Sequence, residues 1–226
     1  MSALAPRVSL HYARFKVTVV ADDTATRSQF ALTAMLGAVD LLADARMAAY
    51  LWSGTSGSWE GIDQDRELVA AIGTRTGAPA TTATLALMES FRALGVRRYG
   101  LVVPYVKPVA QRITDNLAAF GYECVAIDHD ELTTNWEFAT ISADAIAARV
   151  RRVAAAGPDA IAIHCTNLRG AEVAASLERE LEMPVLDSVA VGLWGVLSLL
   201  GVKVPATEFG GLASISLEQV GRTLDG

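Results

Sequence analysis

Cysteine and histidine are scarce in this chain, and their scarcity excludes two kinds of structural support. The two cysteines, Cys124 and Cys165, lie far apart, and the three histidines fall at no spacing typical of metal ligands. We therefore expect neither a disulfide framework nor a metal site. A reducing cytoplasm is the expected compartment.

Positive charge is also limited and dispersed. The 19 Lys and Arg residues are outnumbered by 25 Asp and Glu residues, which gives a formal net charge of −6. The sequence has no basic cluster of the kind that binds phosphate backbones, so we expect no nucleic-acid partner.

Long hydrophobic runs are missing as well. The most apolar stretch, residues 189–202, is interrupted by glycine and serine and is shorter than the roughly 20 residues that span a bilayer. It predicts a buried helix, and we expect no membrane partner. Residues 1–15 contain no sustained apolar segment, so they do not indicate a secretory signal.

Hydrophobic residues make up 52% of the chain and are distributed in a regular pattern. Short β-rich apolar runs alternate with longer segments of helical period, which predicts an α/β fold of parallel strands joined by helices. The pattern places strands at residues 15–20, 48–53, 99–103, 123–127 and 160–164 and around Val185.

The two halves of the chain are organised alike, because a strand runs into a polar loop at residues 53–58 and again at residues 165–167. This similarity predicts two pseudo-symmetric lobes, each a parallel sheet flanked by helices, with the two loops face to face. We expect the first lobe to comprise residues 1–94 with 187–226 and the second residues 95–186, and the active site to lie between them.

Ligands of parallel α/β sheets bind beyond the carboxyl ends of the strands. The loops at these ends are residues 21–24, 54–58, 104–105 and 165–167. The Ser-Gly-Thr-Ser-Gly-Ser run that begins at Ser53 offers free amides and hydroxyls that can hold a carboxylate or a phosphate. Plain helix N-caps have the same composition, so both interpretations stay open.

Cys165 is the candidate catalytic thiol, because it follows an apolar predicted strand directly. The alternative is a buried apolar role, which is our interpretation of Cys124 inside its own strand. His164 would point to the opposite face of the strand from Cys165, so we expect it to serve packing. Asp22 and Asp23 could supply a general base, but a helix N-cap is the commoner role of such residues.

Segments spread over almost the whole chain carry a family resemblance: residues 48–59, 81–82, 94–98, 104–105, 163–167 and 184–188, with Leu193 and Trp194. In their order and spacing they resemble the maleate cis-trans isomerase and arylmalonate decarboxylase branch of the aspartate/glutamate racemase superfamily. The resemblance implies a two-lobed α/β fold that works without cofactor or metal. It also implies that Cys165 is the second of the two cysteines usual in this superfamily.

The first cysteine of the superfamily is replaced here by Gly54. Arylmalonate decarboxylases have the same glycine, so the resemblance implies a decarboxylase acting on a malonate-type dicarboxylate. Cys165, as a neutral thiol, would protonate the enediolate left after carbon dioxide departs. One carboxylate, and the enediolate formed from it, would be held by a set of hydroxyl and amide donors: Thr55, Ser56, Tyr105 and Thr166.

Two features point to the isomerases instead. Thr166 stands where the decarboxylases usually have glycine, and Asn135 falls where the isomerases place a substrate-binding asparagine, although it also fits a helix N-cap or turn. The alternative is therefore a maleate isomerase-like or racemase-like enzyme acting on a small carboxylate or dicarboxylate. A carboxylate-binding paralogue without turnover is the second alternative. Self-association as a homo-oligomer is expected from the family alone.

Overall fold

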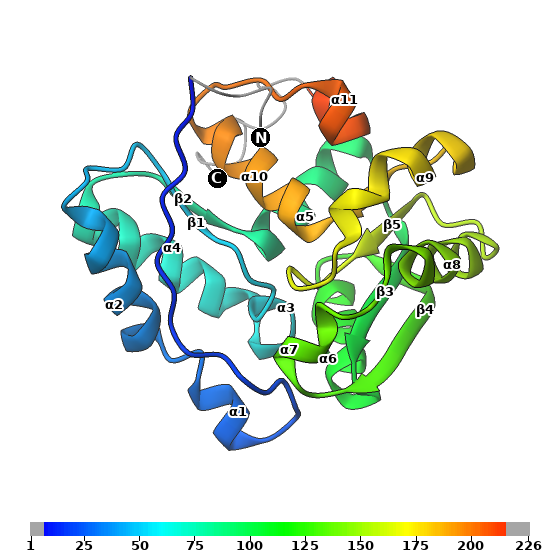
Figure 1. Ribbon diagram of the computed structural model, residues 1–226, viewed down its shortest axis with the longest axis horizontal. Helices are drawn as coiled ribbons and strands as arrows, with labels where there is room; N and C mark the ends of the chain where they lie inside the picture. The colour runs from blue at the N-terminus through cyan, green and yellow to red at the C-terminus, as the bar shows by residue number, and fades with distance from the viewer. Residues whose placement is uncertain (1–6, 216–226) are drawn as a thin grey trace.

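The computed structural model describes residues 7–215, which form two parallel β-sheets surrounded by helices (Figure 1). The smaller sheet pairs β1 (Tyr50–Trp52) with β2 (Ala80–Thr82). The larger sheet has the strand order β4-β3-β5-β6, and all its strands are parallel: β3 (Arg98–Tyr105), β4 (Glu123–Leu132), β5 (Ala160–Ile163) and β6 (Val185–Asp187). The predicted α/β fold, with parallel sheets flanked by helices, is confirmed.

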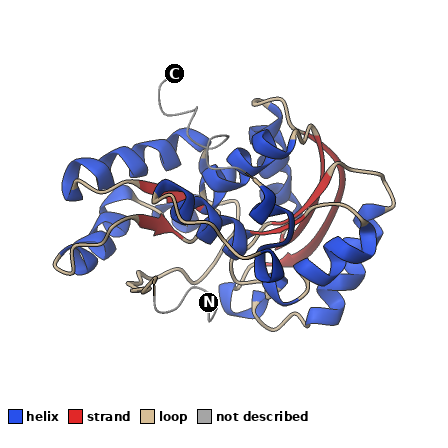
Figure 2. Cartoon of the chain, turned by 90° about the horizontal axis from the view of Figure 1, so that it is seen from above, coloured by secondary structure: helices blue, strands red, loops and turns tan. Residues whose placement is uncertain are grey.

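Helices lie on both sides of the larger sheet (Figure 2). The central strands β3 and β5 are buried along nearly their whole length. Strands covered on both faces are near-continuous apolar runs, which is why the sequence predicts them well. The helices packed against this sheet are α6 (Lys107–Ala118), α8 (Ala143–Ala154) and α9 (Ala174–Leu181).

The smaller sheet is covered by helices from both ends of the chain. They are α4 (Ile62–Thr76), α5 (Ala83–Leu94) and α10 (Ser188–Leu199), and α2 (Leu32–Ala43) packs on α4. The helix α10 is the buried helix predicted from residues 189–202. It follows β6 of the larger sheet but contacts β1, β2 and α5. These contacts support the proposed lobe boundary near residue 187, where the chain returns to the first half.

The remaining elements are short. They are α1 (Thr24–Ser28), α3 (Gly57–Glu60), α7 (Asn135–Phe138) and α11 (Ala206–Phe209), with the 3-10 helices η2 (Gly170–Glu172) and η3 (Gly210–Ser214). Two of them bear on function, because α3 follows the first polar loop and α7 begins at a candidate site residue. Within residues 7–215, each helix is too short or too polar to cross a bilayer.

The prediction of a strand at residues 15–20 is wrong. These residues belong to an extended segment that crosses in front of the first half of the molecule (Figure 1). The segment joins neither sheet and makes one isolated bridge, between Val19 and Thr134. We call residues 13–20 the N-terminal strap. A strap packed on one face has the same period-two pattern as a strand, so the sequence pattern does not separate the two.

The sequence pattern also misses β2. Its three residues include two threonines, so it offers no apolar run. Thr82, at its end, instead serves as the N-cap of α5 by accepting a hydrogen bond from the Leu85 amide at 3.0 Å. A short strand with a capping threonine therefore looks like a loop in the sequence.

Candidate active site

A pocket of about 430 Å³ lies at the carboxyl ends of β1, β3 and β5, beside the N-terminal strap. Both polar loops line it, with residues 53–56 following β1 and residues 165–167 following β5. Tyr105, at the end of β3, and Asn135, at the start of α7, also line it. The candidate thiol and the six candidate substrate-binding residues therefore line one pocket: Cys165 with Gly54, Thr55, Ser56, Tyr105, Asn135 and Thr166.

Cys165 is buried, with 3% of its surface exposed. Burial raises the pKa of its thiol, because a thiolate would lose its hydration there. The Tyr105 hydroxyl and the backbone N–H groups of Asn167 and Leu168 oppose this rise, and the Asp187 carboxylate adds to it. The thiol is consequently protonated at neutral pH, which is the state that a proton donor requires.

The phenol of Tyr105 contacts the loop of the first half. Its hydroxyl lies 3.0 Å from Thr55 Oγ1, and both side chains are buried. The ring packs against Trp59 and Phe138, with centroid distances of 5.0 and 5.4 Å. Burial, together with the neighbouring Cys165, raises the pKa of Tyr105 well above its ordinary value, so the phenol keeps its proton.

Hydrogen bonds hold the first loop in place and leave two of its donors free. The Thr55 carbonyl accepts from Ser58 Oγ at 2.7 Å and from the Ser58 amide at 3.0 Å. Asn116 of α6 donates to the Ser58 carbonyl at 2.9 Å. Among the described residues, no hydrogen bond uses the amide N–H of Thr55 or Ser56. These amides are available to an anion in the pocket.

A buried carboxylate packs against the same loop at Gly57. Asp65 of α4 is 1% exposed and accepts a hydrogen bond from Thr82 Oγ1. Burial raises the pKa of Asp65 to about 6. A Cβ atom at Gly57 would overlap the Asp65 carboxylate, so the loop needs glycine at this position.

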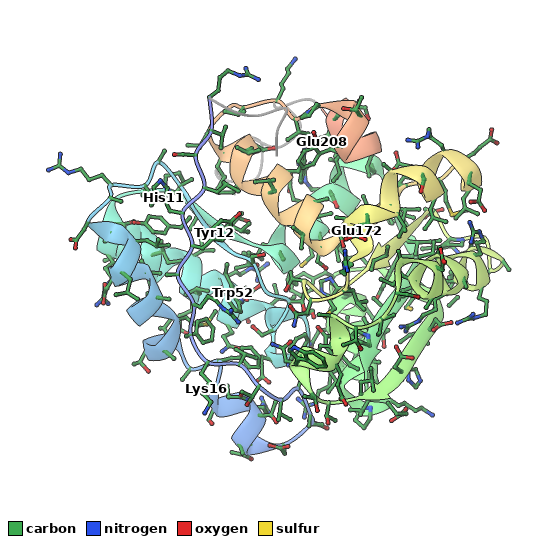
Figure 3. The ribbon with its side chains drawn as sticks, viewed as in Figure 1. His11, Tyr12, Lys16, Trp52, Glu172 and Glu208 are labelled. Carbon is green, nitrogen blue, oxygen red and sulfur yellow. The ribbon has the colours of Figure 1, made fainter. Side chains whose placement is uncertain are left out.

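Gly54 has no space for a side chain. A Cβ atom at Gly54 would overlap the ring of Trp52. The indole N–H of Trp52 donates to Ser56 Oγ at 3.2 Å, and the ring packs against Phe15 of the strap with centroids 5.0 Å apart. Figure 3 shows Trp52 next to the strap. The place expected for a first thiol is therefore filled by an aromatic ring.

Asn135 lines the pocket, but its side-chain amide is engaged within the protein. Its Nδ2 donates to the Val17 carbonyl of the strap at 3.2 Å, and its Oδ1 accepts from Asn167 Nδ2 at 3.1 Å. Asn167 also donates to the Asn135 carbonyl at 2.7 Å. These bonds tie the strap to the loop after β5. Thr166 lies half-buried in that loop, next to Cys165.

Other residues singled out in the sequence have structural roles. Asp23 accepts from the Thr26 amide at 2.7 Å, which confirms the predicted N-cap, and Asp22 pairs with Arg112 at 2.9 Å. His164 is buried, and burial lowers its pKa to about 3, so it is neutral. In residues 7–215, no group of three or more His, Cys, Asp or Glu side chains is arranged to hold a metal ion.

The apolar wall of the pocket was not predicted from the sequence. The wall is formed by aromatic and aliphatic side chains that come from distant parts of the chain: Phe15, Val17, Phe30, Trp52 and Trp59. The available signal was the tryptophan two residues before Gly54. The strap residues carried no signal beyond the alternation that we interpreted as a strand.

Comparison with known proteins identifies the family. The sequence model of the arylmalonate decarboxylase family matches residues 31–213. The chain belongs to this family. The resemblance inferred from the sequence is thereby confirmed. The N-terminal strap lies outside the matched residues, although it lines the pocket of this arylmalonate decarboxylase family member.

The relatives of this chain are named for two different activities, decarboxylation and isomerisation. The chain is 31% identical over 155 residues to the arylmalonate decarboxylase of Bordetella bronchiseptica, an alignment that covers 66% of this chain and 63% of that one. It is 30% identical over 128 residues to the maleate isomerase of Nocardia farcinica, covering 56% of this chain and 51% of the other. The chain therefore spans between about half and two thirds of the length of these relatives.

Solved structures share the fold of this family member. The maleate cis-trans isomerase of Nocardia farcinica bound to TRIS aligns with a TM-score of 0.80, covering 93% of this chain and 89% of that one at 24% identity. A double mutant of arylmalonate decarboxylase in its liganded form aligns with a TM-score of 0.78, covering 88% and 85%, also at 24% identity. At this level of identity the likeness shows the fold.

Proposed function

We propose that this family member is a cofactor-independent decarboxylase of a malonate-type dicarboxylate, with Cys165 as the proton donor. The observation that carries the proposal is the single thiol of the pocket. Trp52 fills the space beside Gly54, and the remaining thiol is buried and protonated. A pocket with one neutral thiol fits protonation of a carbanion on one face.

In this proposal the hydroxyl and amide groups of the loop after β1, with Tyr105, form the anion site that the reaction needs. One substrate carboxylate would accept hydrogen bonds from the amides of Thr55 and Ser56 and from the hydroxyls of Ser56 and Tyr105. The same donors would hold the enediolate, because negative charge moves onto these oxygens as the second carboxylate leaves. Thr166 would add its amide from the other side of the pocket.

The chemical step balances with these groups alone. The bond between the α-carbon and the departing carboxylate breaks, carbon dioxide leaves, and the electron pair of that bond becomes the enediolate. The thiol of Cys165 then transfers its proton to the α-carbon, and the resulting thiolate takes a proton from water. No external oxidant or reductant enters this sequence.

The apolar wall supports the same step. A carboxylate placed against Trp59, Phe30 and Val20 would lose hydration, because these three lining side chains are apolar. Loss of hydration raises the energy of the charged group, and that energy is released when neutral carbon dioxide forms. Among residues 7–215, the side chains that line the pocket include no Asp or Glu that would repel the substrate.

A maleate isomerase-like or racemase-like activity on a small carboxylate is the alternative. Relatives named maleate isomerase favour it, as do Thr166 and the position of Asn135. Its chemistry calls for a thiolate nucleophile or a second acid–base group. A thiolate requires a lowered pKa, whereas burial raises the pKa of Cys165. A carboxylate-binding protein without turnover is the second alternative.

The test is turnover of phenylmalonate, methylmalonate and maleate by the purified protein, followed by proton NMR beside Cys165→Ala. The proposal predicts monocarboxylate product from a malonate, and its loss in the variant. Conversion of maleate to fumarate would favour the isomerase. Saturable binding of these compounds with no product would favour the non-catalytic alternative.

A further inference from the structure

We propose that Trp52 is a positioning and specificity residue of this pocket. Its indole N–H orients the Ser56 hydroxyl toward a bound carboxylate, and its ring limits the group that the ligand can carry. The inference rests on the proposed function only in taking a carboxylate as the ligand. Trp52 directly precedes the polar loop that begins at Ser53.

Three contacts fix the position of Trp52. The residue ends β1, so its backbone is held by the pairing of that strand with β2. Its Nε1 lies 3.2 Å from Ser56 Oγ, its ring covers the face of Gly54, and Phe15 packs against it at a 31° tilt. A ring held by a strand, a hydrogen bond and an aromatic neighbour has little freedom to swing away.

The hydrogen bond to Ser56 determines what that hydroxyl can do. A serine hydroxyl has one hydrogen to donate and two lone pairs to accept with. The indole N–H is a donor only, so it occupies a lone pair of Ser56 Oγ and leaves the hydroxyl hydrogen unused. Ser56 is 2% exposed and lines the pocket, and among the described residues its hydroxyl donates to no acceptor. The free hydrogen is thus available to an anionic ligand.

The ring of Trp52 also forms part of a partition between two cavities. An apolar cavity of about 70 Å³ adjoins the pocket, and Phe15, Leu51 and Trp52 line both. The rest of its lining is mostly apolar and includes Met35, Val39, Leu68 and Ile72. A smaller side chain at position 52 would join the two spaces and admit a bulkier apolar substituent.

The experiment measures binding of phenylacetate, the product expected from phenylmalonate, by calorimetry. The variants are Trp52→Phe, Ser56→Ala and the double variant, with Trp136→Phe as the matched control because its side chain is 73% exposed. Loss of the indole N–H in Trp52→Phe should weaken phenylacetate binding about fivefold to tenfold. This is the cost of losing the hydrogen bond from the Ser56 hydroxyl to the carboxylate. The same change should have a clearly smaller effect in the Ser56→Ala background, and the control change at position 136 should have none.

A second arm tests the partition. Trp52→Leu should raise the affinity for 2-naphthylacetate relative to phenylacetate by about tenfold, the gain expected from added apolar contact. Near-ultraviolet circular dichroism and the Tm of each variant establish that the fold is kept.

The outcomes separate the inference from the proposed function. Equal weakening by Trp52→Phe with and without Ser56, or an unchanged preference in Trp52→Leu, would overturn the inference. Wild-type protein that fails to bind phenylacetate would overturn it as well. If the variants change phenylacetate binding as expected but no malonate is turned over, the proposed function is overturned and the role of Trp52 stands.

Discussion

The Tyr105 hydroxyl lies 3.0 Å from Thr55 Oγ1, which joins the end of β3 in the larger sheet to the loop after β1 in the smaller sheet. Both side chains are buried, and burial keeps the phenol protonated. The contact therefore brings a hydroxyl group from each half of the molecule to the same end of the pocket.

Replacing Tyr105 by Phe removes this donor while keeping the ring that packs on Trp59 and Phe138. We expect kcat to fall by about 10²–10³, the usual cost of one donor to a developing oxyanion. Steady-state kinetics on phenylmalonate measure the change. Tyr122→Phe is the control, because the Tyr122 hydroxyl donates to the Met88 carbonyl outside the pocket. Equal rates in wild type and Tyr105→Phe would remove Tyr105 from the anion site.

Much of this arrangement could be predicted from the sequence. The buried strands β3 and β5 are continuous apolar runs, so they and the loops that follow them were recognisable. Cys165 could be placed at a strand end for the same reason. The strap and Trp52 could not be placed, because an extended segment on a surface looks like a strand and because nothing local shows that the Trp52 ring turns onto Gly54.

Activity should depend on pH through the thiol. A proton donor works while it is protonated, and burial, with a smaller contribution from Asp187, raises the pKa of Cys165. The rate should therefore stay constant up to a pH above the ordinary pKa of a cysteine thiol and fall at higher pH. Asp187→Asn removes the neighbouring carboxylate, so the alkaline limb of the kcat profile should move to lower pH. A rate that climbs with pH through this range would indicate a thiolate nucleophile instead.

Gly54→Ala places a methyl group against the Trp52 ring. We expect this overpacking to lower the free energy of unfolding by about 1–3 kcal/mol, as measured by urea denaturation. In a Trp52→Leu background the same substitution should cost less, because the ring is gone. Gly37→Ala is the control, since a Cβ there meets no neighbouring atom. Similar effects at both glycines would show that the Trp52 ring is not the obstacle.

Asp65 should make stability depend on pH. Its pKa is raised from 3.8 to about 6, so the folded protein holds this proton more tightly than the unfolded chain does. The resulting stabilisation is fully present below the pKa of the unfolded chain and is lost as pH rises through about 6. Its loss lowers the free energy of unfolding by roughly 2–3 kcal/mol.

Asp65→Asn keeps an acceptor for Thr82 and removes the titration. The variant should therefore become more stable than wild type as pH rises from 4 to about 7, as followed by urea denaturation. Asp63→Asn on the same helix is the control, because the Asp63 side chain is 92% exposed. Parallel pH profiles for wild type and Asp65→Asn would contradict the assignment.

The most direct test of the central claim is the stereochemistry of decarboxylation. With 2-methyl-2-phenylmalonate as substrate, chiral chromatography measures the two enantiomers of 2-phenylpropionate formed by wild type and by Cys165→Ser. Because a single thiol delivers the proton to one face, wild type should form one enantiomer, and the rate should be about 10²–10⁴-fold lower in the variant. A racemic product, or turnover that survives loss of the thiol, would contradict it.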